Sequence, residues 1–421
     1  MSYSLIEISN WIDKTEKAVL SLGLDIYPQE FEFYKSKDSF LSIVSQNAFP
    51  ESFFHWSFGR EFENYKFLDE NNMQGIKEVV RNSNPCRAYM WGYNSLPFQI
   101  LVSAHVYAHN NFFKTNKYLR LALLDEPKLK LISVNAEIIK KLKEELGEEV
   151  DKVLDAARYI AFHKDIGQFG GKSSVFKEDI LRYILTQGDL EPWKRKVMEV
   201  VIQWSDHLYP QFITKLINEG WATYWQWKII ERLKEEFNLP RDIYEECRRY
   251  HSHFITLPPI ELKEFLKNPD PYWLGYNIWN ETAKIFADLT YFAANFNNYD
   301  FVHKLLDDSL ACQILALLQP GDLIKNDKDR SEKPADFSSS KLIAFMESYW
   351  GPRSLPRIGV AEGSKDLKLV HLSGESGNQS LLDEKKAGLT LKAMKYLWSR
   401  GEIILETENA AGGSLILRSG E

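Results

Sequence analysis

Apolar side chains recur every three to four positions over most of residues 2–318, with charged side chains between them. This is the period of an amphipathic α-helix, so the pattern predicts a mainly α-helical fold. Pro192 and Pro210 indicate helix boundaries, because a helix interior needs the N–H that proline lacks. The clearest helical ranges are 2–25, 98–113, 134–164, 176–186, 191–208, 211–237 and 272–318.

The pattern changes after residue 318. The stretch that follows is polar, charged and rich in Pro, Gly and Ser, as is typical of a linker. Beyond it, short stretches in which apolar and polar residues alternate predict strands. One stretch with the hydrophobic period of a helix lies between these strands. The strands are expected at 367–372, 402–407 and 414–418, and the helix at 389–399. We therefore expect a large helical domain at residues 1–318, a linker at 319–342 and a small α+β domain at 343–421.

Composition excludes some classes of partner. The net charge is −7, from 52 basic and 59 acidic residues. Binders of nucleic acid or of an anionic membrane surface carry a basic excess or a basic stripe, and the chain has neither. The longest mostly apolar stretch, 98–108, is too short to span a bilayer. We expect no nucleic acid and no membrane insertion.

The N-terminus and the cysteines indicate the compartment. The first 17 residues carry acidic side chains and lack the long apolar run of a signal peptide. The three cysteines are far apart and form no CxxC, so a disulfide framework or a thiolate zinc site is not expected. A reducing, cytoplasmic location fits both observations.

Two histidines one turn apart form the first candidate site. His105 and His109 stand at positions i and i+4 of a predicted apolar helix, so both imidazoles lie on one face. Such a pair can share a metal ion, as in HExxH zinc sites, although Val106 stands where that motif has its general-base Glu. The alternative is a pair of core histidines hydrogen-bonded to neighbouring groups.

A second candidate lies on a later predicted helix. Glu219 stands among apolar residues, where a carboxylate must be paired or coordinated because an unpaired buried charge is costly. Gly220 would allow another backbone or a ligand to approach closely. Gln226 is two turns further along the same face. The alternative is a structural salt bridge to a neighbouring helix.

The remaining candidates are weaker. His55 stands among aromatic residues with Glu61 and Glu63 close by, which fits either a site or a packed aromatic turn. His251 and His253 alternate, so in an extended segment only one of them could join a given site. The glycine-rich stretch 167–173 ends like a Walker loop, but its glycine spacing is wrong and a helix precedes it.

Several segments occur in the order seen in one known family. They are His55-Trp-Ser-Phe-Gly59, Asn82-Ser-Asn-Pro-Cys86, residues 104–114, Tyr209-Pro210, Asn218-Glu-Gly-Trp-Ala222, Tyr272-Trp-Leu-Gly275 and Leu397-Trp-Ser-Arg400. Together they resemble the stage V sporulation protein R (SpoVR) family. The resemblance implies a cytoplasmic protein of spore cortex formation, or of stress and cell-wall regulation. It also implies a serine protein kinase and a von Willebrand-type protein as partners.

The combination of HxxxH with a downstream Asn-Glu-Gly-Trp-Ala segment also resembles the ligand pairing of gluzincin metallopeptidases. That likeness implies a zincin-like core in which His105, His109 and Glu219 bind a divalent metal, zinc or iron. His251 or His55 would fill the fourth position, or it would stay open. Glu61 or Glu63 would be the general base, beside Glu219.

Two functions remain open on these grounds. One is a metal-dependent hydrolase acting on a peptide or a peptidoglycan-derived substrate. The other is a non-catalytic regulator that docks the kinase or the von Willebrand-type protein. Members of the family often carry His where this chain has Gln226, so one metal ligand of the family is replaced here.

Overall fold

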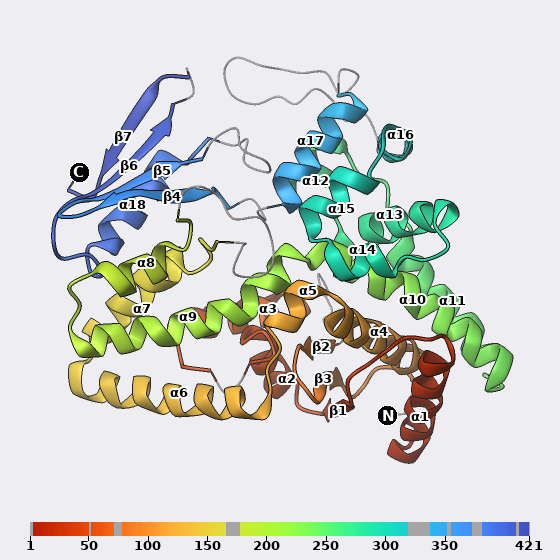
Figure 1. Ribbon diagram of the computed structural model, residues 1–421. Coiled ribbons are helices and arrows are strands. Elements are labelled where there is room, and N and C mark those ends of the chain that lie inside the picture. Colours follow the sequence, from red (N-terminus) through yellow and green to blue (C-terminus); the bar gives the residue numbers. More distant parts are fainter. Residues whose placement is uncertain are drawn as a thin grey trace. The chain divides into compact units, whose positions relative to one another are not determined.

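The computed structural model of the chain describes residues 3–49, 52–70, 78–165, 177–318, 337–351, 355–372, 381–409 and 412–420 (Figure 1). These residues are mainly helical, as the hydrophobic pattern predicts. They form two compact units, and each unit is assembled from three separate stretches of the chain.

The first unit comprises Met1–Phe40, Gly75–Arg120 and Ile213–Gly351. It holds a three-stranded sheet in the order β1-β3-β2, in which β1 is parallel and β2 antiparallel to β3. The strands are β1 (Gln29–Tyr34), β2 (Glu78–Arg81) and β3 (Cys86–Trp91). The helices are α1 (Leu5–Ser21), α4 (Leu96–Thr115), α5 (Lys117–Leu121), α10 (Lys215–Glu236), α11 (Arg241–Ile255), α12 (Leu262–Lys267), α13 (Pro271–Ile285), α14 (Thr290–Asn295), α15 (Asn298–Leu305), α16 (Asp308–Leu317) and α17 (Ser339–Trp350).

Helices α4 and α10 lie at the centre of this unit and pack against each other. Both are buried on several faces because apolar residues surround them, whereas an ordinary surface helix buries one stripe. On one face of α4, Val102 and Val106 pack against Ala88 and Met90 of β3. Val106 therefore contributes to the core beneath the sheet.

Helices α10 and α13 approach each other at a pair of glycines. A Cβ atom added to Gly220 would lie 2.4 Å from the carbonyl carbon of Gly275, and one added to Gly275 would lie 2.5 Å from the carbonyl oxygen of Leu216. Both distances are far inside van der Waals contact. The close approach expected at Gly220 is therefore made by the backbone of α13.

The second unit comprises Leu41–Gln74, Leu121–Phe212 and Pro352–Glu421. Its helices are α3 (Trp56–Glu70), α6 (Glu126–Leu146), α7 (Glu148–Ile160), α8 (Ile180–Gln187), α9 (Pro192–Ile213) and α18 (Glu384–Met394). Helix α2 (Lys37–Ser45) crosses the division between the units. The single helix expected at 134–164 is wrong, because Gly147 adopts a φ of 58° and separates α6 from α7.

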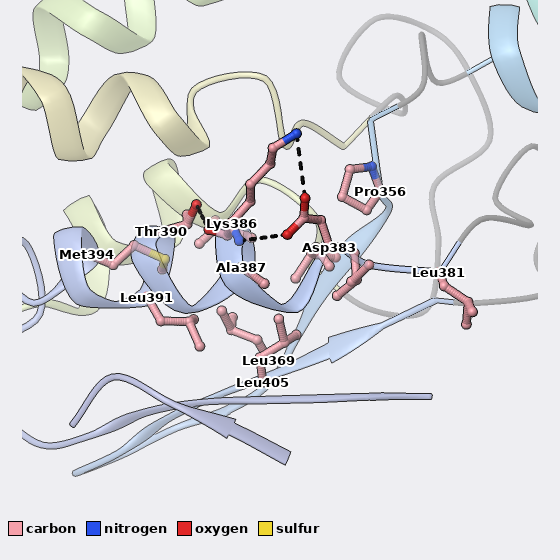
Figure 2. A pocket seen from close by; sticks show the side chains of 13 residues that line it. Pro356, Leu369, Leu381, Asp383, Lys386, Ala387, Thr390, Leu391, Met394 and Leu405 are labelled. Atoms are coloured by element: carbon pink, nitrogen blue, oxygen red, sulfur yellow. Dashed lines mark hydrogen bonds and ion pairs between the residues drawn. The ribbon is translucent and has the colours of Figure 1, made fainter. Parts of the chain in front are cut away.

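The tail of the chain forms a four-stranded sheet in the order β4-β5-β6-β7. Its strands are β4 (Ile358–Gly363), β5 (Leu367–His371), β6 (Ile403–Glu408) and β7 (Ser414–Arg418). Helix α18 connects the parallel strands β5 and β6 and packs between this sheet and α7. A cavity of about 320 Å³ lies between α18 and the sheet, lined mainly by aliphatic side chains such as Leu369, Leu391 and Leu405 (Figure 2).

Other sequence expectations differ from the structure in detail. The α+β character of the tail is confirmed, but its helix begins at Glu384 rather than 389. Helix α9 continues through Pro210 to Ile213, so this proline lies inside the last turn. The tail strands share a hydrophobic core with residues of 121–212, and α17 belongs to the first unit, so the grouping differs from the expected division at 343. Most of the expected linker lies outside the described residues.

None of the described helices combines the length and the apolar character needed to cross a membrane.

Candidate metal centre

Helix α4 presents His105 and His109 side by side. Ser95 caps the helix by accepting from the N–H of Phe98, and Pro97 lies in the first turn, so the sequence defines where the helix starts. The two imidazoles are one turn apart, with ring centroids 4.5 Å from each other. Both histidines are buried, at 5% and 7% exposure. Their placement on one helical face follows from the i, i+4 spacing.

Helix α10 brings Glu219 to the same place. One of its carboxylate oxygens, Oε2, lies 3.3 Å from Nε2 of His109 and 3.6 Å from Nε2 of His105. One potential ligand atom from each of the three residues lies within 4.8 Å of the others, and all three side chains are buried. The structure thus brings together the three residues on which the metal hypothesis depends, from segments more than 100 positions apart.

Two side-chain amides orient the imidazoles. Nδ1 of His109 donates to Oδ1 of Asn218 at 2.9 Å, and Nδ1 of His105 donates to Oε1 of Gln226 at 2.8 Å. Each imidazole then carries its proton on Nδ1, which leaves a lone pair on Nε2. Both lone pairs are directed at Glu219. This is the outer hydrogen bonding that histidine ligands of metals usually have.

Two of the facing atoms lack a hydrogen bond. Nε2 of His105 and Oε2 of Glu219 are buried and have no hydrogen-bond partner among the described residues. Their separation of 3.6 Å is too long for a hydrogen bond between them. Unpaired buried polar atoms cost about 1–3 kcal/mol each, so such a pair needs an explanation.

The charge states favour a cation. Burial alone would raise the pKa of Glu219, but the Lys215 ammonium brings that pKa well below its usual value. Burial lowers the pKa of His105. The site therefore holds an ionised carboxylate beside a neutral imidazole, which are the protonation states that metal binding requires. Lys215 contacts Oε1, the other oxygen of the Glu219 carboxylate.

Aromatic side chains pack against the two histidines of the candidate metal site. The ring of Tyr272 stacks on His105 with centroids 5.8 Å apart, and Phe113 stacks on His109 at 6.0 Å. Burial and the charge of Glu219 raise the pKa of the Tyr272 phenol well above its usual value, so it keeps its proton. Tyr272 and Asn218 were recognised from the sequence only as parts of family segments, without a role, and Lys215 was missed. The spacing of Lys215 and Asn218, four and one residues from Glu219, was the available signal.

His251 occupies a different position from the one expected. The extended segment predicted for residues 250–253 is wrong, because these residues belong to helix α11. Nδ1 of His251 accepts a hydrogen bond from Nε2 of Gln226 at 2.7 Å, and the ring stacks on Trp227 at 5.1 Å. His251 thus contacts the amide that orients His105, and it is not among the residues whose ligand atoms converge.

The other candidates belong to the second unit. Glu61 lies near the surface on α3, 3.5 Å from Arg60, and Glu63 is exposed on the same helix. His55 is buried just before α3 and pairs with Asp155 of α7. None of the three belongs to the compact unit that holds His105, His109 and Glu219.

The donor set fits a divalent transition metal. Ligands bonded at about 2.0–2.1 Å in a tetrahedron stand about 3.3 Å from one another. The distances from Glu219 to the two imidazoles, 3.3 and 3.6 Å, are close to that value. Two imidazoles and one carboxylate suit zinc or iron and leave further coordination positions open.

Comparisons with known proteins identify the family. The family described as "SpoVR like protein" matches residues 2–175 and 172–304, so this chain belongs to the SpoVR family. The protein YcgB of Escherichia coli (strain K12), described as uncharacterized, is 25% identical over 333 residues. The aligned region covers 68% of this chain and 64% of YcgB, so the chain spans less than two thirds of that relative's length. No solved structure matches.

Proposed function

We propose that this SpoVR-family protein binds one divalent metal ion, zinc or iron, through His105, His109 and Glu219, and acts as a metal-dependent hydrolase. A divalent cation in such a site supplies Lewis-acid activation of water or of a carbonyl group. The family membership supports a role in sporulation, such as spore cortex formation, or in stress and cell-wall regulation. We place this activity in the cytoplasm.

One observation carries the proposal. A buried carboxylate oxygen and two imidazole nitrogens face one another at 3.3 and 3.6 Å, while amides hold the opposite nitrogens of both rings. A purely structural cluster would turn a ring N–H toward the carboxylate, at hydrogen-bond distance. Here the Nδ1 protons are directed away from Glu219, which leaves room for a cation between the three atoms.

Four further side chains of the first unit would position the ligands of such an ion or contact a molecule bound to it. Gln226 and Asn218 fix the ring orientations and tautomers of the two histidines. Lys215 holds Oε1 of Glu219 and leaves Oε2 to face the imidazoles. Tyr272, which retains its proton beside the site, can donate a hydrogen bond to a bound oxygen.

A regulator without catalysis is the second candidate. The Lys215 ammonium already compensates the charge of Glu219, as a structural ion pair would. In that case the cluster only stabilises the packing of α4 against α10. The protein then acts by binding a serine protein kinase or a von Willebrand-type protein.

Elemental analysis of the full chain, purified without chelator, separates the two candidates. We expect close to one equivalent of zinc or iron in the wild type, and loss of most of it in His109→Ala and in Glu219→Gln. The matched control is His303→Ala, since His303 is exposed and paired with Glu347 on the surface of the same unit. This variant should keep its metal.

The variants must also be shown to fold. Circular dichroism and urea unfolding of each variant establish this. Trace metal in a folded wild type, unchanged by His109→Ala, would overturn the metal proposal and favour the regulator.

A further inference from the structure

A second cluster of reactive side chains lies in the other unit, where the chain enters α3. Nδ1 of His55 and Oγ of Ser57 are 2.8 Å apart, and Nε2 of His55 is 3.0 Å from Oδ1 of Asp155. His55 and Ser57 are 2% and 7% exposed, and the Asp155 side chain is about one third exposed. A hydroxyl, an imidazole and a carboxylate are thus connected in one chain of hydrogen bonds.

The surrounding donors determine where the imidazole proton lies. The backbone N–H of Ser57 donates to Nδ1 of His55 at 3.3 Å, so Nδ1 is an acceptor and the ring proton is on Nε2. That proton is donated to Asp155, whose Oδ1 also accepts from the indole N–H of Trp56 at 2.8 Å. The lone pair of Nδ1, which accepts this backbone N–H, also faces the hydroxyl of Ser57. A general base needs this tautomer to take the proton of a serine nucleophile.

Ser57 lies in the first turn of a 15-residue helix. The positive end of the helix favours negative charge developing near that turn. A Cβ built on Gly59 would meet no heavy atom within 4 Å, so there is open space beside the same turn. Serine hydrolases of the nucleophile-elbow type also place their serine at the start of a helix, with a glycine two residues later.

An arginine nearby has an unused donor. Arg158 follows Asp155 by one turn of α7, and its charge is among the causes that lower the pKa of His55. The guanidinium lies over the rings of Phe58 and Trp204, at 4.8 and 4.5 Å. Its Nη1 atom is buried and has no hydrogen-bond partner among the described residues. A helix cap made by His55 does not require such a donor, whereas a site for an anionic substrate does.

We propose that Ser57, His55 and Asp155 form a serine-nucleophile site for an ester or amide whose acyl part carries an anionic group, held by Arg158. The site is separate from the metal centre and does not depend on it. His55 takes the proton of Ser57 through Nδ1 as Oγ bonds to the carbonyl carbon. The same proton then passes to the leaving alcohol or amine as the scissile bond breaks. Water, deprotonated by His55, hydrolyses the acyl-serine and restores the hydroxyl.

Labelling with a fluorophosphonate tests this on the full-length protein. Such a probe forms a phosphonyl ester with an activated serine and releases fluoride, and peptide mass spectrometry identifies the modified residue. We expect a label on Ser57 in the presence of a metal chelator. His55→Ala should slow the labelling at Ser57 by about 100-fold or more, which is the usual contribution of a general base.

The controls separate activation from accidental modification. Ser52→Ala is the matched control, because Ser52 belongs to the same unit and has no histidine partner among the described residues. This variant should be labelled at Ser57 like the wild type. No label at Ser57 in the folded wild type, or a label that forms equally fast in His55→Ala, would overturn the proposal. His55 would then be a helix cap that connects α3 to α7. Because the chelator is present throughout, these outcomes do not depend on the metal proposal.

Discussion

Replacing Gly220 by alanine tests the close packing of α10 against α13, next to the candidate ligand Glu219. Gly220 follows Glu219 on α10 and lies against Gly275 of α13. The added Cβ would stand 2.4, 2.5 and 2.6 Å from the carbonyl carbon, Cα and carbonyl oxygen of Gly275. Ordinary contacts of this kind are about 3.5–4.0 Å, so the two helices would have to separate by about 1 Å.

The expected magnitude has two opposing parts. Alanine is better than glycine inside a helix by about 1 kcal/mol. Overpacking a core typically costs about 1–3 kcal/mol, and more where the obstacle is backbone, which cannot change rotamer. We expect a net loss of about 2 kcal/mol in the free energy of unfolding of the first unit. Because Glu219 is the preceding residue, metal uptake should fall as well.

Urea unfolding followed by tryptophan fluorescence measures the effect. With a slope of about 2 kcal/mol per M, the midpoint should fall by about 1 M. Gly388→Ala is the control, because Gly388 is also inside a helix but a Cβ there meets no heavy atom within 4 Å. That variant should be stabilised by up to about 1 kcal/mol. A Gly220→Ala protein as stable as the wild type would refute the close packing of α10 against α13.

Two further predictions concern stability. Burial, and then the charge of Arg158, lower the pKa of His55 from 6.5 to about 4, against the opposing effect of Asp155. The unfolded chain therefore binds more protons between these pH values, so stability should fall by up to about 3 kcal/mol as the pH drops from 6.5 to 4. Urea unfolding measured at several pH values should show that the free energy of unfolding of His55→Gln depends less on pH than that of the wild type. An equal dependence on pH in the two proteins would contradict the assignment. Asn116→Ala should cost about 3 kcal/mol or more, because the buried amide donates to the carbonyls of Ala293 and Phe296 at 2.7 and 2.9 Å. A loss below about 1 kcal/mol would show that these carbonyls find other partners.

Local sequence determined much of the helical framework. Ser95 and Pro97 define the start of α4, and the apolar period over 98–113 predicts its course. Strand β7 was predicted at its observed bounds, because the apolar run 415–417 stands between Gly413 and Gly420, with one polar residue at each end of the strand. Where one residue decides a boundary, the pattern was less informative. The hydrophobic period continues through Gly147, but the helix ends there. The hydrophobic pattern does not reveal the left-handed backbone conformation of this glycine.

The candidate site could be predicted only in part. The i, i+4 spacing of His105 and His109 is a local property of one helix, and so the sequence by itself determined that both imidazoles share a face. Only the tertiary structure decided that Glu219 lies beside them, because no local sequence pattern predicts that α10 packs against α4. It also decided that Gln226 connects His105 to His251, and that Ser57, His55 and Asp155 meet. Contacts between residues about 100 positions apart depend on how whole helices pack, which no short window of sequence contains.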